Sequence, residues 1–115
     1  MEVLVFGVKK SADTRSALRF FAERRIKVHF VDLAERPASQ GELTRFVQKF
    51  GVEALLDRDS VRFAHLGLAA ARLSPERWLD RLSEEPLLLR LPLVRNQQQL
   101  TVGAAEETWR IWTGR

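Results

Sequence analysis

The segment Phe6-Gly7-Val8-Lys9-Lys10-Ser11-Ala12-Asp13-Thr14-Arg15-Ser16-Ala17-Leu18 decides the fold of this 115-residue chain. It continues a short apolar run, Val3 to Phe6, whose brevity favours a buried strand over a helix. From Ser11, a residue type that caps helices, the apolar residues recur at helical spacing. Residues 27–33 then alternate as a second strand would, so the sequence begins with a predicted βαβ unit.

The rest of the chain carries further helix and hairpin signals. They are a capping box at Ser39 and Glu42 with a helix end at Gly51, short helical turns over 52–73, a helix start at Ser74-Pro75, a strand that begins or bends at Pro92, a hairpin around 96–99, and a final helix from Ala104 to Trp112. The order βαβα, helical insert, ββα predicts an α/β protein with a mixed sheet flanked by helices. Because no repeat, low-complexity tract or linker interrupts it, we expect one domain over residues 1–115.

The composition excludes several classes of protein. Apolar residues make up 45% and charged residues 30% of the chain, which is ordinary for a globular protein. No apolar stretch is long enough to span a membrane and no basic flank precedes the first apolar run, so we expect no membrane segment and a cytoplasmic location. The chain has no cysteine, which excludes disulfides, thiolate metal sites and a cysteine nucleophile.

The charge balance is basic, with 19 Lys and Arg against 15 Asp and Glu and a formal charge of +4. An acidic or nucleic-acid partner is therefore considered. Acidic residues interrupt the arginines, as in Glu23-Arg24-Arg25, Asp57-Arg58-Asp59 and Asp80-Arg81. This pattern is typical of a solvated surface, and nucleic-acid binding is the weakest of the functional alternatives.

The opening segment resembles the first strand, active-site loop and first helix of the arsenate reductase and Spx family. In that family the loop reads approximately Tyr-Gly-Ile-Lys-Asn-Cys-x-x-Cys-Arg-Lys-Ala-Leu. The similarity continues in three later stretches, in the same order and spacing: Leu55-Leu56-Asp57-Arg58, Leu87 to Val94, and Leu100-Thr101-Val102-Gly103. The resemblance implies a thioredoxin-like fold across nearly the whole chain.

The resemblance also implies which residues occupy the site. It lays the family's reactive cysteine on Ser11 and the second cysteine on Thr14, so the catalytic positions are degenerate. It makes Ser11, Arg15, Arg58 and Arg90 candidates for binding an anion and predicts a cis peptide bond between Leu91 and Pro92. The arginine that the family places before this proline falls on Leu91. Ser11 is more simply a helix cap, because a serine nucleophile needs a positioned base and no histidine lies near it in sequence.

The remaining polar and aromatic residues predict no cofactor. His29 and His65 are 36 positions apart, and without cysteine they are poor evidence for a zinc site, so no metal is predicted. The three tryptophans, Trp78, Trp109 and Trp112, fall on predicted helix stripes and are assigned to core packing.

Three functional hypotheses follow from these features. The leading one is a non-enzymatic domain that binds a protein partner or a small anion through the inherited loop. By analogy with Spx, the resemblance points to the transcription machinery as the partner. The second is a divergent reductase or glutathione-dependent transferase that uses a non-cysteine site. The third is a weak nucleic-acid-binding module, which the basic charge alone suggests.

Overall fold

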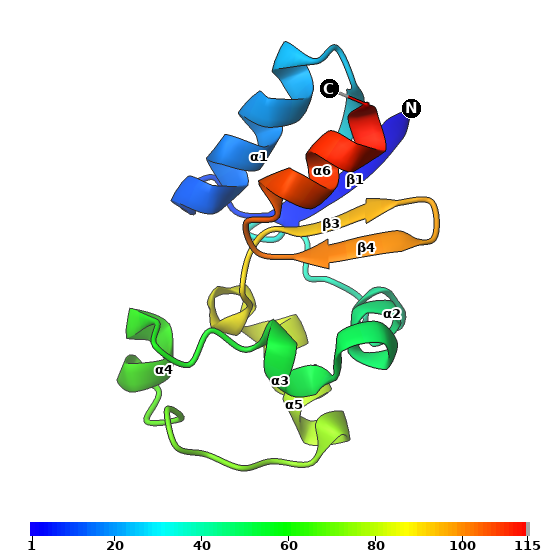
Figure 1. Cartoon of the computed structure of the whole chain (residues 1–115). Helices are drawn as coiled ribbons and strands as arrows, with labels where there is room; N and C mark the ends of the chain where they lie inside the picture. The colour runs from blue at the N-terminus through cyan, green and yellow to red at the C-terminus, as the bar shows by residue number, and fades with distance from the viewer. Residues whose placement is uncertain (115) are drawn as a thin grey trace. The chain divides into compact units, whose positions relative to one another are not determined.

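The computed structural model describes residues 1–114 (Figure 1), which group into two compact units. The first unit holds residues 1–36 and the chain from Leu91 onward, and the second holds Pro37–Arg90. The elements in chain order are β1 (Glu2–Gly7), α1 (Ala12–Glu23), β2 (Lys27–Asp32), α2 (Gln40–Phe50), α3 (Val52–Leu55), α4 (Val61–His65), α5 (Pro75–Glu84), the 3₁₀ helix η1 (Pro86–Leu88), β3 (Leu93–Asn96), β4 (Gln99–Val102) and α6 (Glu106–Thr113). Within the described residues, each helix is too short or too polar to cross a membrane. The expectation of a single domain stays a prediction.

The first unit is built on a four-stranded mixed sheet with the order β2-β1-β3-β4. β1 runs parallel to β2 and antiparallel to β3, and β3 forms an antiparallel hairpin with β4. Val5, at the middle of β1, lies opposite Phe30 on one side and Val94 on the other. This central position explains why β1 reads as an uninterrupted apolar run, and the predicted α/β sheet is confirmed.

Helices α1 and α6 lie side by side over this sheet (Figure 1) and bury its core. The buried side chains come from β1, α1, β3 and α6, namely Val3, Val5, Ala17, Phe20, Phe21, Val94 and Trp109. The ring centroids of Phe21 and Trp109 are 5.4 Å apart. The Trp109 indole N–H donates to the hydroxyl of Thr101 over 2.8 Å, so its polar edge is satisfied inside the core. Packing is therefore the use of this tryptophan, as predicted.

The helix caps are the features that the sequence predicted most closely. Ser11 accepts a hydrogen bond from the Thr14 backbone N–H, and Ser39 and Glu42 form the complete capping box. Ser74 caps α5 with Pro75 in its first turn. The final helix begins at Glu106 and not at Ala104. The prediction was wrong there because Ala105, at the cap, has non-helical dihedrals and no side chain that could cap an earlier start.

The second unit is helical and has its own core. The rings of Phe63 on α4 and Trp78 on α5 lie 5.8 Å apart between centroids, and Trp78 is 2% exposed. Only an isolated antiparallel bridge, Leu56 to Leu89, represents β structure among residues 37–90. Helix α5 ends before Pro86, which begins η1.

The proline at the start of β3 has the geometry expected from the family resemblance. The Leu91–Pro92 peptide bond is cis, and β3 begins directly after it at Leu93. The carbonyl of Pro92 accepts a hydrogen bond from Gly103 N–H over 2.8 Å. Proline lacks an N–H and can serve the sheet only as an acceptor, so its place at the entry to the strand is consistent with its chemistry.

The end of β1 packs tightly against the first turn of α1, and this contact needs a glycine. A Cβ atom on Gly7 would lie 2.5 Å from both Cγ2 and Oγ1 of Thr14, which is fully buried. We expect Gly7→Ala to lower the free energy of unfolding by about 1 to 3 kcal/mol through overpacking. Urea denaturation of the purified chain measures this change.

A double-mutant cycle tests the cause of that loss. The Thr14 hydroxyl has no hydrogen-bond partner among the described residues, so Thr14→Ala should cost only the packing of its methyl group. Gly7→Ala with Thr14→Ala should then lose less stability than the sum of the single variants. Strict additivity would contradict the contact as the reason for the glycine.

Candidate functional site

Ser11, the family's reactive-cysteine position, lies in the loop between β1 and α1 and is half-buried. Its backbone N–H donates to the Val8 carbonyl over 3.1 Å, and its Oγ accepts from Thr14 N–H over 3.2 Å. Among residues 1–114 this cap is the hydrogen bond that its side chain forms, and no histidine or carboxylate contacts the hydroxyl. A serine without a base is a poor nucleophile, so the geometry supports the capping role.

The second cysteine position, Thr14, is fully buried against Gly7. Its side chain is therefore closed to a substrate. Of the two degenerate positions, only Ser11 reaches the surface.

Arg15, the next candidate, is exposed and turns back toward the loop. Its Nη1 donates to the carbonyl of Lys9 over 2.7 Å. This bond holds one guanidinium beside residues 9–14, at the N-terminal end of α1. A helix N-terminus favours anions, because its first N–H groups lack intrahelical partners and the macrodipole is positive there. Asp13 lies in the same first turn and would oppose a bound anion.

Arg58 is held in a closed set of contacts within the second unit. Its Nε and Nη2 donate to the two carboxylate oxygens of Glu53, and its Nη1 donates to the carbonyls of Ala69 and Ala71 at 3.0 Å each. Its guanidinium carbon lies 5.4 Å from the Trp78 ring centroid. These contacts tie the segment between α4 and α5 to α3 and give Arg58 a structural role, while its part in binding an anion stays a prediction.

The ion pair between Glu53 and Arg58 also shifts the pKa of both side chains. The hydrogen bond from Arg58 is the main cause that lowers the pKa of the Glu53 carboxyl, and the same bond raises the pKa of Arg58. Because the carboxyl pKa is lower in the folded chain, its contribution to stability is present above the ordinary carboxyl pKa. It is lost as the pH falls through the lowered value.

Arg90 is exposed and donates from Nη2 to the Leu56 carbonyl over 3.2 Å, within the second unit. The anion candidates thus divide between the units, with Ser11 and Arg15 in the first and Arg58 and Arg90 in the second. A common anion site stays a prediction. Leu91, where the family has arginine, is a buried leucine that carries no charge.

A cavity of about 510 Å³ lies within the second unit beside Arg58. Its walls are Val52, Glu53, Arg58, Ala69, Ala70, Arg72, Leu73 and Trp78. Sequence reasoning missed this cavity, since the segment between α4 and α5 carries no periodic signal. Glu53 and Arg58 satisfy each other on its wall, which leaves Arg72 as a cation without a hydrogen bond or ion pair to the described residues.

The histidines are not brought together with other ligands. His29 Nε2 contacts Glu2 Oε1 at 2.5 Å across β1 and β2, and both side chains are half exposed. Within residues 1–114 no group of three or more metal-ligating side chains exists.

The mixed sheet, the capped loop after β1 and the cis proline at β3 define an α/β protein of the thioredoxin-like class. A sequence model of the ArsC family matches residues 6–112, and the chain belongs to this family. The solved arsenate reductase from Vibrio cholerae is 24% identical, with 94% of each chain covered and a TM-score of 0.80. A solved protein named YFFB is 18% identical over 95% of this chain and 96% of that one, with a TM-score of 0.86. The uncharacterized protein YusI of Bacillus subtilis is 22% identical over 93% of this chain and 94% of its own length.

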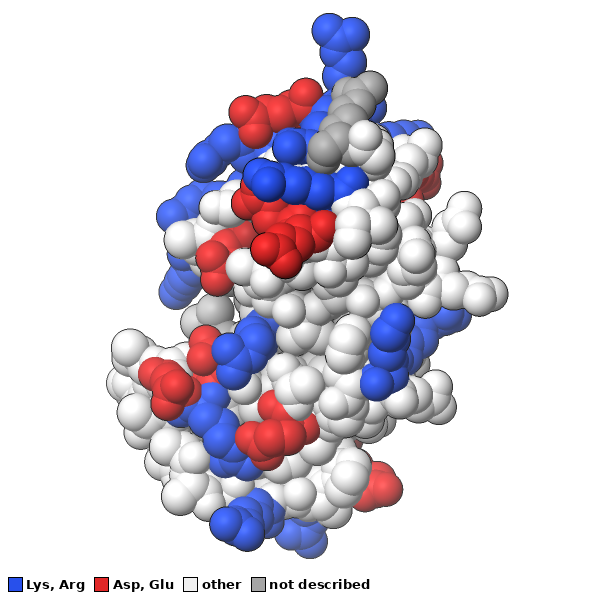
Figure 2. Space-filling view, viewed as in Figure 1, with Lys and Arg blue, Asp and Glu red and all other residues white. Residues whose placement is uncertain are grey.

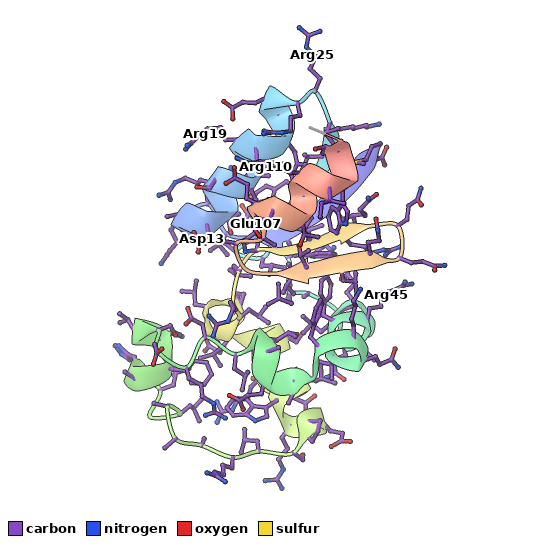
Figure 3. All side chains as sticks on the ribbon, viewed as in Figure 1. Asp13, Arg19, Arg25, Arg45, Glu107 and Arg110 are labelled. Atoms are coloured by element: carbon purple, nitrogen blue, oxygen red, sulfur yellow. The ribbon has the colours of Figure 1, made fainter. Side chains whose placement is uncertain are left out.

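The Arg58 contacts lead to a stability prediction. Arg58→Lys keeps the charge but cannot reproduce the planar fork that reaches Glu53 and two carbonyls at once. We expect a loss of about 1 to 2 kcal/mol in the free energy of unfolding, from hydrogen bonds that contribute about 1 kcal/mol each. Arg45→Lys is the matched control, because Arg45 is exposed on α2 (Figure 3). Equal stability of the two variants in urea denaturation would refute the structural role of Arg58.

Proposed function

We propose that this ArsC-family chain is a binding domain that works without thiol chemistry, through the loop of residues 8–14 and the adjoining surface of α1. One observation carries the proposal. The chain contains no cysteine, yet the loop and helix start that would present one keep an ordered cap at Ser11. The scaffold of the reactive site is therefore present without its reactive atom.

The chemistry of sulfur explains why reduction is not proposed. A helix N-terminus and nearby cations lower the pKa of a thiol, and the thiolate is the species that attacks arsenate or a disulfide. A serine hydroxyl is far less acidic than a thiol, and among residues 1–114 no base contacts that of Ser11. Binding is the use that remains for the same surface. The first candidate for the ligand is a protein partner, and by analogy with Spx this partner would belong to the transcription machinery. A small anion at the start of α1 is a second ligand of the same site.

The first test is chemical. Neither arsenate reduction nor disulfide exchange should exceed the blank when glutathione or thioredoxin is supplied, since both reactions need a protein thiolate. Ser11→Cys should introduce a thiol with a pKa below the ordinary value of about 8.5, because the helix N-terminus is retained. The absorbance of the thiolate against pH measures this pKa. Turnover by the parent chain would overturn the proposal and favour a divergent reductase or glutathione-dependent transferase.

The second test is a sulfate titration followed by amide NMR. We expect residues 11–15 to shift with a dissociation constant of about 1 mM, which corresponds to roughly 4 kcal/mol of binding free energy. Arg15→Gln should weaken binding several-fold, and Arg45→Gln, a change of equal charge on α2, should not. The chemical shifts of these amides could instead stay unchanged at tens of millimolar sulfate, which is at least about ten times the expected dissociation constant. The loop would then bind no small anion, and only a protein partner would remain as the proposed ligand.

A further inference from the structure

The excess positive charge of the chain lies in one short segment, residues 9–25, which is the loop after β1 and helix α1 with its end. This segment holds 6 of the 19 basic residues and 2 of the 15 acidic ones, which leaves 13 of each in the remainder of the chain. The net charge of +4 therefore belongs entirely to these 17 residues, although acidic residues are interspersed locally. Such a concentration creates a local positive field where the remainder of the chain is balanced.

Five of the six cations point outward and are defined here as the α1 basic face. They are the exposed residues Lys9, Lys10, Arg15, Arg19 and Arg25. Arg24 is excluded, because its guanidinium lies 3.6 Å from the Phe20 ring centroid and donates to the Phe20 carbonyl. Figure 3 shows Arg19 extending from α1 and Arg25 beyond its end, and Figure 2 shows basic side chains along this edge of the first unit.

The α1 basic face follows the whole helix. Arg15 and Arg19 are four residues apart and so share one side of α1, opposite the buried Ala17 and Phe21. Lys9 and Lys10 precede the helix start, and the acidic Glu23, four residues after Arg19, lies on the same side of α1. The 12 residues of α1 span about 18 Å, which is the length of a short peptide helix.

Arg15 donates to the Lys9 carbonyl, but ion pairs within the described residues do not explain these five cations. None of the five forms an ion pair with a described residue, whereas Arg58, Arg62 and Arg110 each have a carboxylate partner. Lys9 and Lys10 also precede the positive end of the helix dipole, where a cation is unfavourable. Asp13 in the first turn and Arg25 beyond the last turn match the dipole, so the unfavourable charges are those of Lys9 and Lys10.

The side chains around the α1 basic face distinguish between two kinds of acidic partner. Surfaces that bind single-stranded nucleic acid usually add aromatic side chains on which bases stack. The exposed large apolar residues among 1–114 are Met1, Phe50, Val61 and Ile111, and all lie outside residues 9–25. Small exposed residues, Ala12, Ser16 and Ala22, instead separate the arginines and let another backbone approach closely.

We infer that the α1 basic face docks an acidic segment of a partner protein, with carboxylates that pair with Arg15 and Arg19. The inference rests on the proposed binding function and names the chemistry of its partner. Arginine suits this role because its planar fork matches a carboxylate in two parallel hydrogen bonds. Carboxylates one helical turn apart in the partner match the spacing of Arg15 and Arg19.

The experiment uses the full chain and three probes in fluorescence anisotropy and amide NMR. The first is a 12-residue peptide, the length of α1, with Glu pairs at four-residue spacing. The second is the same peptide with Gln for Glu, and the third is a single-stranded oligonucleotide of similar length. We expect the acidic peptide to shift the amide resonances of residues 9–25 and to bind at least about tenfold more tightly than its Gln counterpart. Its binding should weaken as added salt shortens the Debye length to about 8 Å.

A pair of variants with equal charge separates docking from general attraction. The double variant Arg15→Gln, Arg19→Gln should bind the acidic peptide about tenfold or more weakly than the parent chain does. Arg45→Gln with Arg77→Gln removes the same charge from exposed positions of the second unit and should leave its affinity within about twofold of the parent. Equal losses in both pairs, no peptide binding, or tighter binding of the oligonucleotide than of the acidic peptide would overturn the inference. These outcomes do not bear on the predicted absence of turnover, whereas turnover would overturn the proposed function whatever the peptide does.

Discussion

The contact between Gly7 and Thr14 is the constraint on which the first unit depends. It sets how closely the end of the central strand approaches the first turn of α1, because any Cβ at position 7 would enter the space of the buried threonine. The approach fixes where the loop of residues 8–11 leaves the sheet, and Ser11 then closes the helix with its cap. The core face of α1 follows from that placement, with Ala17 and Phe21 against β1. A loop this tightly held is suited to presenting a reactive group, and its cap at Ser11 needs no sulfur.

The features predictable from the sequence are those whose chemistry is local. A serine that accepts from an N–H three residues on, or a proline in a first helical turn, acts within one turn of chain, and both Ser39 and Pro75 lie where their patterns indicate. The sequence predicts that the last helix starts at Ala104, but the helix begins at Glu106. Neither Ala104 nor Ala105 has a side chain that could cap an earlier start. Local signals therefore fix helix starts well only where a polar side chain marks them.

The role of Arg58 could not be predicted, because its partners are set by tertiary structure. Ala69 and Ala71 contribute backbone carbonyls, which have no signature in sequence, and they reach the guanidinium only when the segment between α4 and α5 folds back. The family resemblance singled out Arg58 as an anion-binding candidate but could not distinguish a guanidinium that binds a ligand from one that binds its own chain. The observed saturation by Glu53 and two carbonyls supplies that distinction.

The loss of sulfur changes the electrostatics of the loop as well as its reactivity. In a thiolate-bearing loop, surrounding cations are compensated by the negative sulfur that they stabilise. Ser11 is neutral, so the repulsion of Lys9 and Lys10 by the positive end of α1 is not offset by a sulfur, although Asp13 in the first turn offsets part of it. Exposure to water and salt reduces this repulsion but does not turn it into attraction. An anion or acidic partner at this end of α1 would supply negative charge to the same cations, which is the electrostatic basis of the proposed binding function.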